Sequence, residues 1–272
     1  KQYAPKEVQV VLPEDVILRV DQLSMHFGGL KAVNELSFEV KKGEIFGLIG
    51  PNGAGKTTVF NCITQFYKQT HGYIYYVDKL GETVVLNHQA VHNVIRKGIV
   101  RTFQNVELIW ELTILENLLV AAHTHYHTNI LAQFLRTRRL RVEEEVMRAK
   151  AMKILQSLGL SAYAMAYPVG LPYGILKKIE FARTLMGNPK LIILDEPAAG
   201  LNDRESEELA ATIKAIQKEY DVTIFLVEHD MDLVMKICDT ICAISFGKKL
   251  AVGTPKEIQN NPVVQEAYLG GE

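Results

Sequence analysis

One short stretch limits the folds open to this chain more than any other feature. Residues 50–57 read Gly-Pro-Asn-Gly-Ala-Gly-Lys-Thr, a glycine followed by four residues and then Gly-Lys-Thr. Glycines let backbone N–H groups turn towards a phosphate, and a helix that starts there directs its positive end at the same anion. An apolar run at 45–49 precedes the stretch and a helical pattern follows from Lys56 to about Phe66. The sequence therefore predicts a strand, a phosphate-binding loop and a helix.

Two residues of this loop have defined tasks in phosphoryl transfer. Lys56 is expected to reach the β- and γ-phosphates of a nucleotide, and the Thr57 hydroxyl to bind Mg²⁺. A glycine-rich turn with a purely structural role is the alternative, and the flanking strand and helix patterns argue against it. We therefore predict ATP and Mg²⁺ as cofactors, with the nucleotide bound by Asn52, Gly53, Ala54, Gly55, Lys56, Thr57 and Thr58.

A second segment places two adjacent acids at the end of an apolar run. Residues 191–196 read Leu-Ile-Ile-Leu-Asp-Glu. A buried parallel strand has such a run, and ligands bind beyond the carboxyl ends of such strands. Asp195 is the candidate Mg²⁺ carboxylate, and Glu196 is the candidate general base that polarises the attacking water. Solvated acids at a strand end are the alternative, which the phosphate loop upstream disfavours.

The order of strand and helix patterns predicts the fold class. Residues 16–47 alternate apolar and polar positions, as β-strands do, whereas strand signals are few between about 105 and 188. From 190 onward short strands alternate with helices, which indicates a parallel sheet wrapped by helices. We predict an α/β domain at 14–272 after an extension at 1–13. It has a mostly parallel core sheet, an N-terminal antiparallel β subdomain at about 14–47 and an inserted α-helical subdomain at about 105–188.

Composition bears on compartment and partners. A formal net charge of −1 disfavours broad electrostatic capture of nucleic acid or of an anionic membrane. The three cysteines, Cys62, Cys238 and Cys242, do not suggest a disulfide framework. Cys238 and Cys242 could share a helix face and bind a metal, although small buried side chains are the simpler interpretation. No apolar stretch approaches the length that spans a bilayer or the form of a signal peptide, so we expect a cytoplasmic chain whose membrane role comes through a partner.

Further motifs in the same order make the chain resemble the ABC ATPase family over almost its whole length. Gln104, in Arg-Thr-Phe-Gln-Asn, looks like the glutamine that contacts Mg²⁺ or the attacking water, and His229 like the switch histidine at the γ-phosphate. Phe27 looks like the aromatic that stacks on adenine, with Val33 as a further nucleotide contact. Residues 199–203 resemble the D-loop, which crosses the interface between two such subunits.

The resemblance also implies the fold and the site. The fold would be the P-loop NTPase cassette of that family, acting as an ATPase coupled to transport. Its catalytic residues would be Glu196, His229, Gln104 and Lys56, and its Mg²⁺ ligands Thr57, Gln104 and Asp195. Each bound ATP would also touch the signature segment of a second subunit in trans.

That signature segment departs from the commonest pattern of the family, Leu-Ser-Gly-Gly-Gln. Here it reads Leu171-Pro172-Tyr173-Gly174-Ile175. Pro172 removes a serine hydroxyl and a backbone N–H that could meet a γ-phosphate. Tyr173, Gly174 and the start of the following helix remain as an anion site. We therefore expect Pro172, Tyr173 and Gly174 to contact the partner subunit's nucleotide.

The same segment narrows the resemblance to the ATPases of branched-chain and other hydrophobic amino-acid importers. The tyrosine before the glycine supports it, as do residues 195–202, 228–231 and the ending 261–270. Related ATPases serve urea uptake or lipopolysaccharide export. A soluble non-transport ABC ATPase and a P-loop kinase or GTPase are the alternatives from other classes, and the ordered motifs argue against the latter.

The resemblance implies partners as well. They would be a second ABC ATPase subunit, in a homodimer or a heterodimer, two transmembrane permease subunits and, indirectly, a substrate-binding protein. No nucleic acid is expected, and the chain would lie at the cytoplasmic face of the inner or plasma membrane. Two weaker features stay open. His123–His127 could bind a metal but more simply packs or is solvated, and the basic Arg136–Arg141 could touch lipid headgroups but more simply forms a solvated helix boundary.

Overall fold

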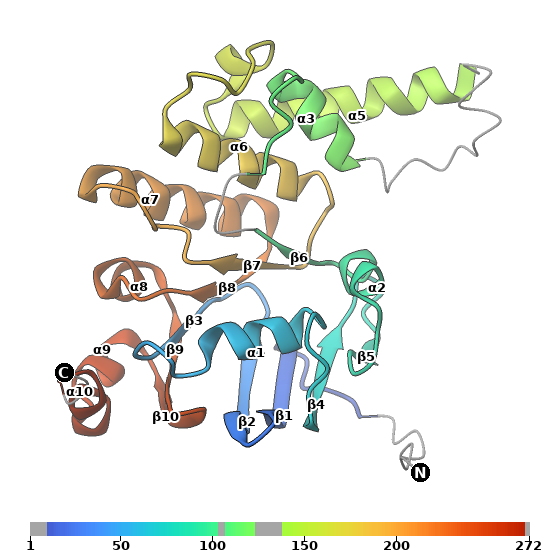
Figure 1. Cartoon of the computed structure of the whole chain (residues 1–272). Helices are drawn as coiled ribbons and strands as arrows, with labels where there is room; N and C mark the ends of the chain where they lie inside the picture. The colour runs from blue at the N-terminus through green and yellow to red at the C-terminus, as the bar shows by residue number, and fades with distance from the viewer. Residues whose placement is uncertain (1–9, 103–106, 123–137, 270–272) are drawn as a thin grey trace.

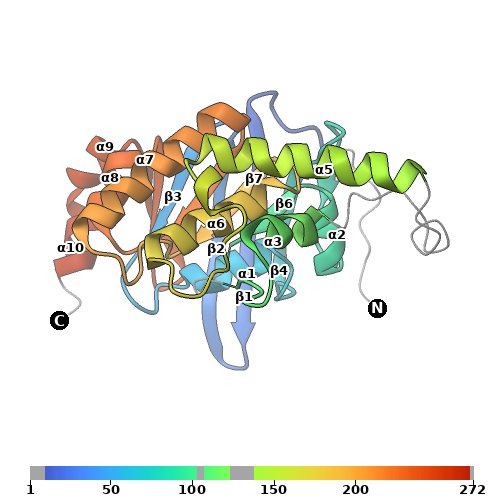
Figure 2. The ribbon, with the colours of Figure 1, turned by 90° about the horizontal axis from the view of Figure 1, so that it is seen from above.

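The computed structural model describes residues 10–102, 107–122 and 138–269. Two sheets and a group of helices make up this part of the chain (Figure 1). The six-stranded sheet has the order β10-β9-β3-β8-β7-β6, and the four-stranded sheet has the order β2-β1-β4-β5. The helices α3, α5 and α6 form a separate layer at the top of Figure 1, and in Figure 2, which is seen from above, they lie in front of the sheets.

The six-stranded sheet is parallel apart from one edge. Parallel pairs join β9 to β3, β3 to β8, β8 to β7 and β7 to β6, whereas β10 runs antiparallel to β9. Every residue of β3, β7 and β8 is buried, which is why these strands are continuous apolar runs rather than alternating ones. Their bounds are β3 (Ile45–Ile49), β6 (Ile99–Arg101), β7 (Leu191–Asp195), β8 (Thr223–Val227), β9 (Thr240–Ser245) and β10 (Lys248–Gly253).

The helices of the core alternate with these strands along the chain. The helix α1 (Lys56–Ile63) begins directly after the phosphate loop, and α2 (Val91–Arg96) precedes β6. After β7, α7 (Asp203–Tyr220) and α8 (Met231–Ile237) alternate with the strands, and α9 (Pro255–Gln259) and α10 (Pro262–Leu269) end the described chain. The prediction of strands alternating with helices from 190 onward is confirmed.

The four-stranded sheet is antiparallel throughout. It pairs β1 (Val16–Phe27) with β2 (Leu30–Lys41) and with β4 (His71–Val77), which in turn pairs with β5 (Thr83–Val85). The predicted antiparallel sheet thus exists. It takes in β1 and β2 from the range 14–47 and also residues 71–85, whereas residues 45–47 belong to β3 of the core sheet. Its buried side chains share one cluster with those facing them from the core sheet. Phe38 of β2 stacks on Phe46 of β3 at 5.3 Å between ring centroids, which joins the two sheets.

The helical layer lies between β6 and β7 in the chain. It holds α3 (Ile114–Ala121), α5 (Arg138–Ser157), a 3-10 turn η2 (Ser161–Tyr163) and α6 (Tyr173–Leu185). A capping box between Thr113 and Glu116 starts α3, and the apolar faces of α3, α5 and α6 pack into the larger core cluster. No helix of the described part is long and apolar enough to cross a membrane.

Candidate active site

The phosphate loop lies between β3 and α1, as the sequence predicts. Gly53 and Gly55 have φ values of 78° and 100°, which only glycine adopts without strain. A Cβ atom at Gly50 would collide with the carbonyl oxygen of Ile244, so close approach requires a glycine there too. Asn52 and Thr57 are exposed, Thr58 is half-buried and Ala54 is buried. The loop therefore presents backbone groups and short polar side chains at the start of α1.

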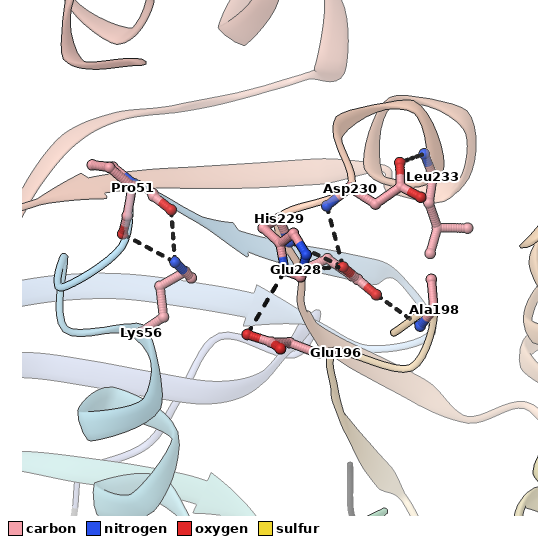
Figure 3. A network of polar contacts seen from close by, with 9 residues as sticks. Pro51, Lys56, Glu196, Ala198, Glu228, His229, Asp230 and Leu233 are labelled. Atoms are coloured by element: carbon pink, nitrogen blue, oxygen red, sulfur yellow. Dashed lines mark hydrogen bonds and ion pairs between the residues drawn. The ribbon is translucent and has the colours of Figure 1, made fainter. Parts of the chain in front are cut away.

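The Lys56 ammonium is held by the loop itself. It donates to the carbonyl oxygens of Gly50 at 2.6 Å and Pro51 at 3.1 Å (Figure 3). Burial lowers the pKa of Lys56, while the nearby Glu196 carboxylate raises it. A buried cation that faces one carboxylate and two carbonyl oxygens provides charge for a phosphate group at this point.

Asp195 ends β7 and is bound by a cation that sequence reasoning did not assign. Arg101 of β6 places Nη2 3.2 Å from Asp195 Oδ2 and donates from Nη1 to Asn61 of α1 at 3.1 Å. The guanidinium also lies 4.1 Å from the ring centroid of Phe60. Burial raises the pKa of Asp195, and the charge of Arg101 opposes that rise. Arg101 thus ties the carboxylate at the end of β7 to the helix that follows the phosphate loop.

Glu196 and His229 lie together at the ends of neighbouring strands. Glu196 follows β7 in the left-handed region, with φ 47°, and its backbone N–H donates to Val227 at the end of β8. Its Oε1 lies 3.8 Å from Nδ1 of His229, and both side chains are accessible to solvent (Figure 3). Strain at a non-glycine residue is a feature that proteins retain at functional sites. The predicted base and the predicted switch histidine are therefore neighbours.

Glu228 fixes the loops on either side of that pair. Its carboxylate is buried and accepts backbone N–H groups from Ala198, His229 and Asp230 at 2.9, 3.0 and 3.2 Å. Burial raises the pKa of Glu228, and these three hydrogen bonds lower it. Asp230 caps α8 by accepting from Leu233. The segment after β7 and the segment after β8 thus share one anchor.

The predicted adenine platform has a second aromatic member. Phe27 ends β1 with 43% of its surface exposed, and the Tyr67 ring packs edge-on against it at 5.4 Å between centroids. Val33, by contrast, is fully buried beneath the phosphate loop, because its Cγ2 fills the space next to Gly55. Val33 therefore packs in the core in this conformation and offers no exposed surface to a nucleotide.

The signature segment forms the start of α6. Pro172 occupies the N-cap position without a side-chain cap, and its carbonyl accepts the N–H groups of Ile175 and Leu176. Tyr173 is 37% exposed, and a Cβ atom at Gly174 would meet Glu205 of α7 at 3.8 Å. Tyr173 also approaches Gly200 of the D-loop-like segment. The signature residues therefore lie beside the D-loop of the same chain.

Some predicted features fall outside the described residues. Gln104 lies outside them, as does His123–His127, and of Arg136–Arg141 only the backbone from Arg138 and the exposed Arg141 are described. Within the described ranges, no group of three or more histidine, cysteine, aspartate or glutamate side chains is arranged to hold a metal ion. Cys238 ends α8 while Cys242 lies in β9, so the two do not share a helix face, and all three cysteines are buried as thiols.

The fold and site together define a P-loop ATPase cassette with an inserted helical layer. A family model described as ABC transporter matches residues 33–199, and the chain belongs to this family of ATP-binding cassettes. A second model, branched-chain amino acid ATP-binding cassette transporter, matches residues 248–272. This membership excludes a P-loop kinase or GTPase, and it confirms the predicted cassette fold and nucleotide-binding class.

Curated relatives narrow the resemblance further. The chain is 47% identical to the high-affinity branched-chain amino acid transport ATP-binding protein BraF of Pseudomonas aeruginosa, over 93% of this chain and 98% of that one. It is 44% identical to LivG of Escherichia coli K12, with the same coverage of 93% and 98%. Among solved structures, a nucleotide-free ATP-binding cassette from an ABC transporter superposes with a TM-score of 0.77 at 32% identity, covering 93% of this chain and 98% of that one.

Proposed function

We propose that this chain hydrolyses ATP with Glu196 as the general base and His229 as the contact to the γ-phosphate. The observation that carries the proposal is the meeting of Glu196, His229 and Lys56 at one edge of the parallel sheet. Glu196 orients water in line with the phosphorus, while Lys56 neutralises charge that develops on the transferred group. Phosphoryl transfer requires mainly such positioning and electrostatic stabilisation.

The donors present also suit Mg²⁺. A hydroxyl at the start of α1 and a carboxylate at the end of β7, Thr57 and Asp195, are the oxygen ligands that this hard cation prefers. Bound with the nucleotide, Mg²⁺ would neutralise phosphate charge. Asp195 is already held by Arg101, which also donates to Asn61, so its carboxylate is preorganised. Gln104 remains the third proposed ligand from its place in the motif.

The second half of each nucleotide site comes from another cassette. Tyr173 and Gly174 are accessible at the N-terminus of α6, where an anion is favoured. We infer that two cassettes pair head to tail, with Pro172, Tyr173 and Gly174 of each facing the nucleotide of the other. ATP closes the pair because it contacts both halves, and hydrolysis removes that differential contact. The partner is a second copy of this chain or a related cassette.

The names of the curated relatives support a proposal for the transported solute. BraF and LivG are named for branched-chain amino acid transport, and the C-terminal family model carries the same description. We propose that this ATPase drives import of branched-chain or other hydrophobic amino acids, peripherally bound to two permease subunits at the cytoplasmic face. A substrate-binding protein would deliver the solute. These names favour amino-acid import over urea uptake and lipopolysaccharide export.

Recovery of the tagged chain from membranes of its native host tests the assignment. We expect two multi-spanning subunits, a second cassette and an amino-acid receptor to be identified with it. Ribosomal or DNA-repair partners without any membrane protein would contradict the transport assignment while leaving the ATPase chemistry intact. A tagged Glu196→Gln chain serves as a matched sample, because it should keep the same membrane partners without turnover.

A further inference from the structure

The C-terminal segment contacts the phosphate loop although it is distant in sequence. The turn between β9 and β10 donates the Gly247 N–H to the carbonyl of Ala54 at 2.9 Å and accepts from Asn34 at 2.9 Å. A Cβ atom at Gly247 would collide with the carbonyl of Ala32, so the turn fits closely against the loop. Residues 248–272, which match the branched-chain family model, begin directly after this turn.

A second contact comes from α10. Tyr268 packs against the core cluster that contains Ile49, the residue immediately before the phosphate loop, and Val264 of the same helix. The Tyr268 hydroxyl is enclosed beside the backbone N–H of Gly50, yet within the described chain it completes no hydrogen bond of normal geometry. Burial raises the pKa of Tyr268 to about 12, so the group is a neutral hydroxyl at physiological pH.

The position of the Gly50 peptide affects the position of the Lys56 side chain. Its carbonyl accepts the Lys56 ammonium at 2.6 Å, and the carbonyl of Ile244 occupies the space where a Cβ would lie. A shift of the Gly50 peptide therefore moves the anchor of Lys56. A buried hydroxyl without a hydrogen-bond partner costs free energy. A small movement of Gly50 towards Tyr268 would form a hydrogen bond and so reduce that cost.

We propose that Tyr268 is a positioning residue for the phosphate loop. In the nucleotide-bound loop its hydroxyl accepts the Gly50 N–H, so that the C-terminal helix sets the affinity of the loop for ATP. The inference rests on the proposed function, since it concerns ATP binding at the same loop. It gives α10 of this chain a role at the nucleotide site.

Equilibrium ATP binding to the full chain and to Tyr268→Phe tests this inference. One hydrogen bond contributes about 0.5–1.5 kcal/mol, so we expect the variant to bind ATP about fivefold more weakly. Its melting temperature without nucleotide should stay unchanged or rise, because the unpaired hydroxyl is gone. A purely structural role predicts the opposite, a lower melting temperature with unchanged affinity, and that result would overturn the proposal.

Tyr220→Phe is the matched control. The Tyr220 hydroxyl lies 2.7 Å from Ser157 Oγ, far from the phosphate loop in the chain, so its loss should lower the melting temperature without affecting ATP affinity.

A second measurement, of hydrogen exchange, needs no variant. Because linkage is reciprocal, ATP should slow hydrogen exchange in a peptide spanning α10, and unchanged exchange would contradict the inference. Absence of ATP binding by the unmodified chain would instead refute the proposed function itself.

Discussion

At the scale of single residues, the role of Glu196 is the most direct to test. We expect Glu196→Gln to lower ATP turnover at least about 100-fold while ATP remains bound, because the amide cannot accept a proton from water. Steady-state phosphate release and retention of labelled ATP on gel filtration measure the two effects. Glu219→Gln, an exposed glutamate near the end of α7, should leave turnover unchanged. Undiminished turnover in Glu196→Gln would remove Glu196 from the role of base.

Tyr67 carries a second prediction at this scale. Its ring holds Phe27 edge-on, and such aromatic pairs contribute about 0.5–1.5 kcal/mol. Tyr67→Ala should therefore weaken ATP binding about threefold to tenfold, whereas Tyr67→Phe should retain affinity. Affinity for inorganic tripolyphosphate, which lacks the base, should not change. Tyr73→Ala on β4 is the matched control, and an equal loss of affinity there would show that Tyr67 has no special role.

The positions of the predicted site residues follow from the sequence where a short motif fixes them. Lys56 and Thr57 lie at the start of α1, and Asp195 ends a buried strand, because glycine-rich loops and apolar strands are local features. Arg101 and Tyr67 were missed as site residues because their importance arises from contacts across the fold. Arg101 reaches Asp195 only because β6 and β7 are neighbours in the sheet, although the two residues are far apart in the chain. The site roles themselves remain predictions.

At the scale of elements, Glu228 links the segment after β7 to the segment after β8 through its hydrogen bonds. Loss of these hydrogen bonds should therefore disturb both segments together. Glu228→Gln replaces one acceptor oxygen by an amide donor that faces backbone N–H groups. We expect a loss of about 2 kcal/mol in the free energy of unfolding, together with reduced ATPase activity, because His229 and the segment at Ala198 lose their attachment. Urea denaturation with a turnover assay measures both quantities.

The control for this prediction is Glu207→Gln. Glu207 lies on the surface of α7 and pairs with Lys236 at 2.9 Å, so its substitution should leave the free energy of unfolding nearly unchanged. Equal stability losses in the two variants would contradict an anchoring role for Glu228. Unchanged activity in Glu228→Gln would separate stability from function at this position.

Elements were predicted best where their pattern is local. The buried strands β7 and β8 and the amphipathic α7 lie in the region from 190 onward, where alternating strands and helices are expected. The antiparallel sheet was placed correctly at its start, but its true extent depends on β4 pairing with β1 across about 50 residues of intervening sequence. Such pairing is decided by packing against the core, here through Ile74 and Tyr76 of β4, which are buried in the cluster that the two sheets share. Periodicity alone does not encode that choice.

At the scale of the whole molecule, the departure at Pro172 predicts how strongly two cassettes pair. Proline at the N-cap of α6 leaves the helix without a side-chain cap and removes one backbone N–H from the helix start that we propose faces the partner's nucleotide. Pro172→Ser restores a hydroxyl and that N–H. In the Glu196→Gln background we therefore expect ATP-dependent association of two cassettes to become about tenfold tighter, which corresponds to one charge-assisted hydrogen bond.

Sedimentation equilibrium with and without ATP measures this association. Ala90→Ser is the matched control, because Ala90 is an N-cap of α2 that likewise lacks a side-chain cap but belongs to no signature segment. Both substitutions should stabilise the cassette by up to about 1 kcal/mol through helix capping, and only Pro172→Ser should tighten the pair. Equal effects of the two substitutions on association would mean that helix capping, and not a contact with the partner's nucleotide, tightens the pair. Weaker association in Pro172→Ser would mean that the proline ring itself packs against the partner cassette. The proposed contact in trans would then be apolar.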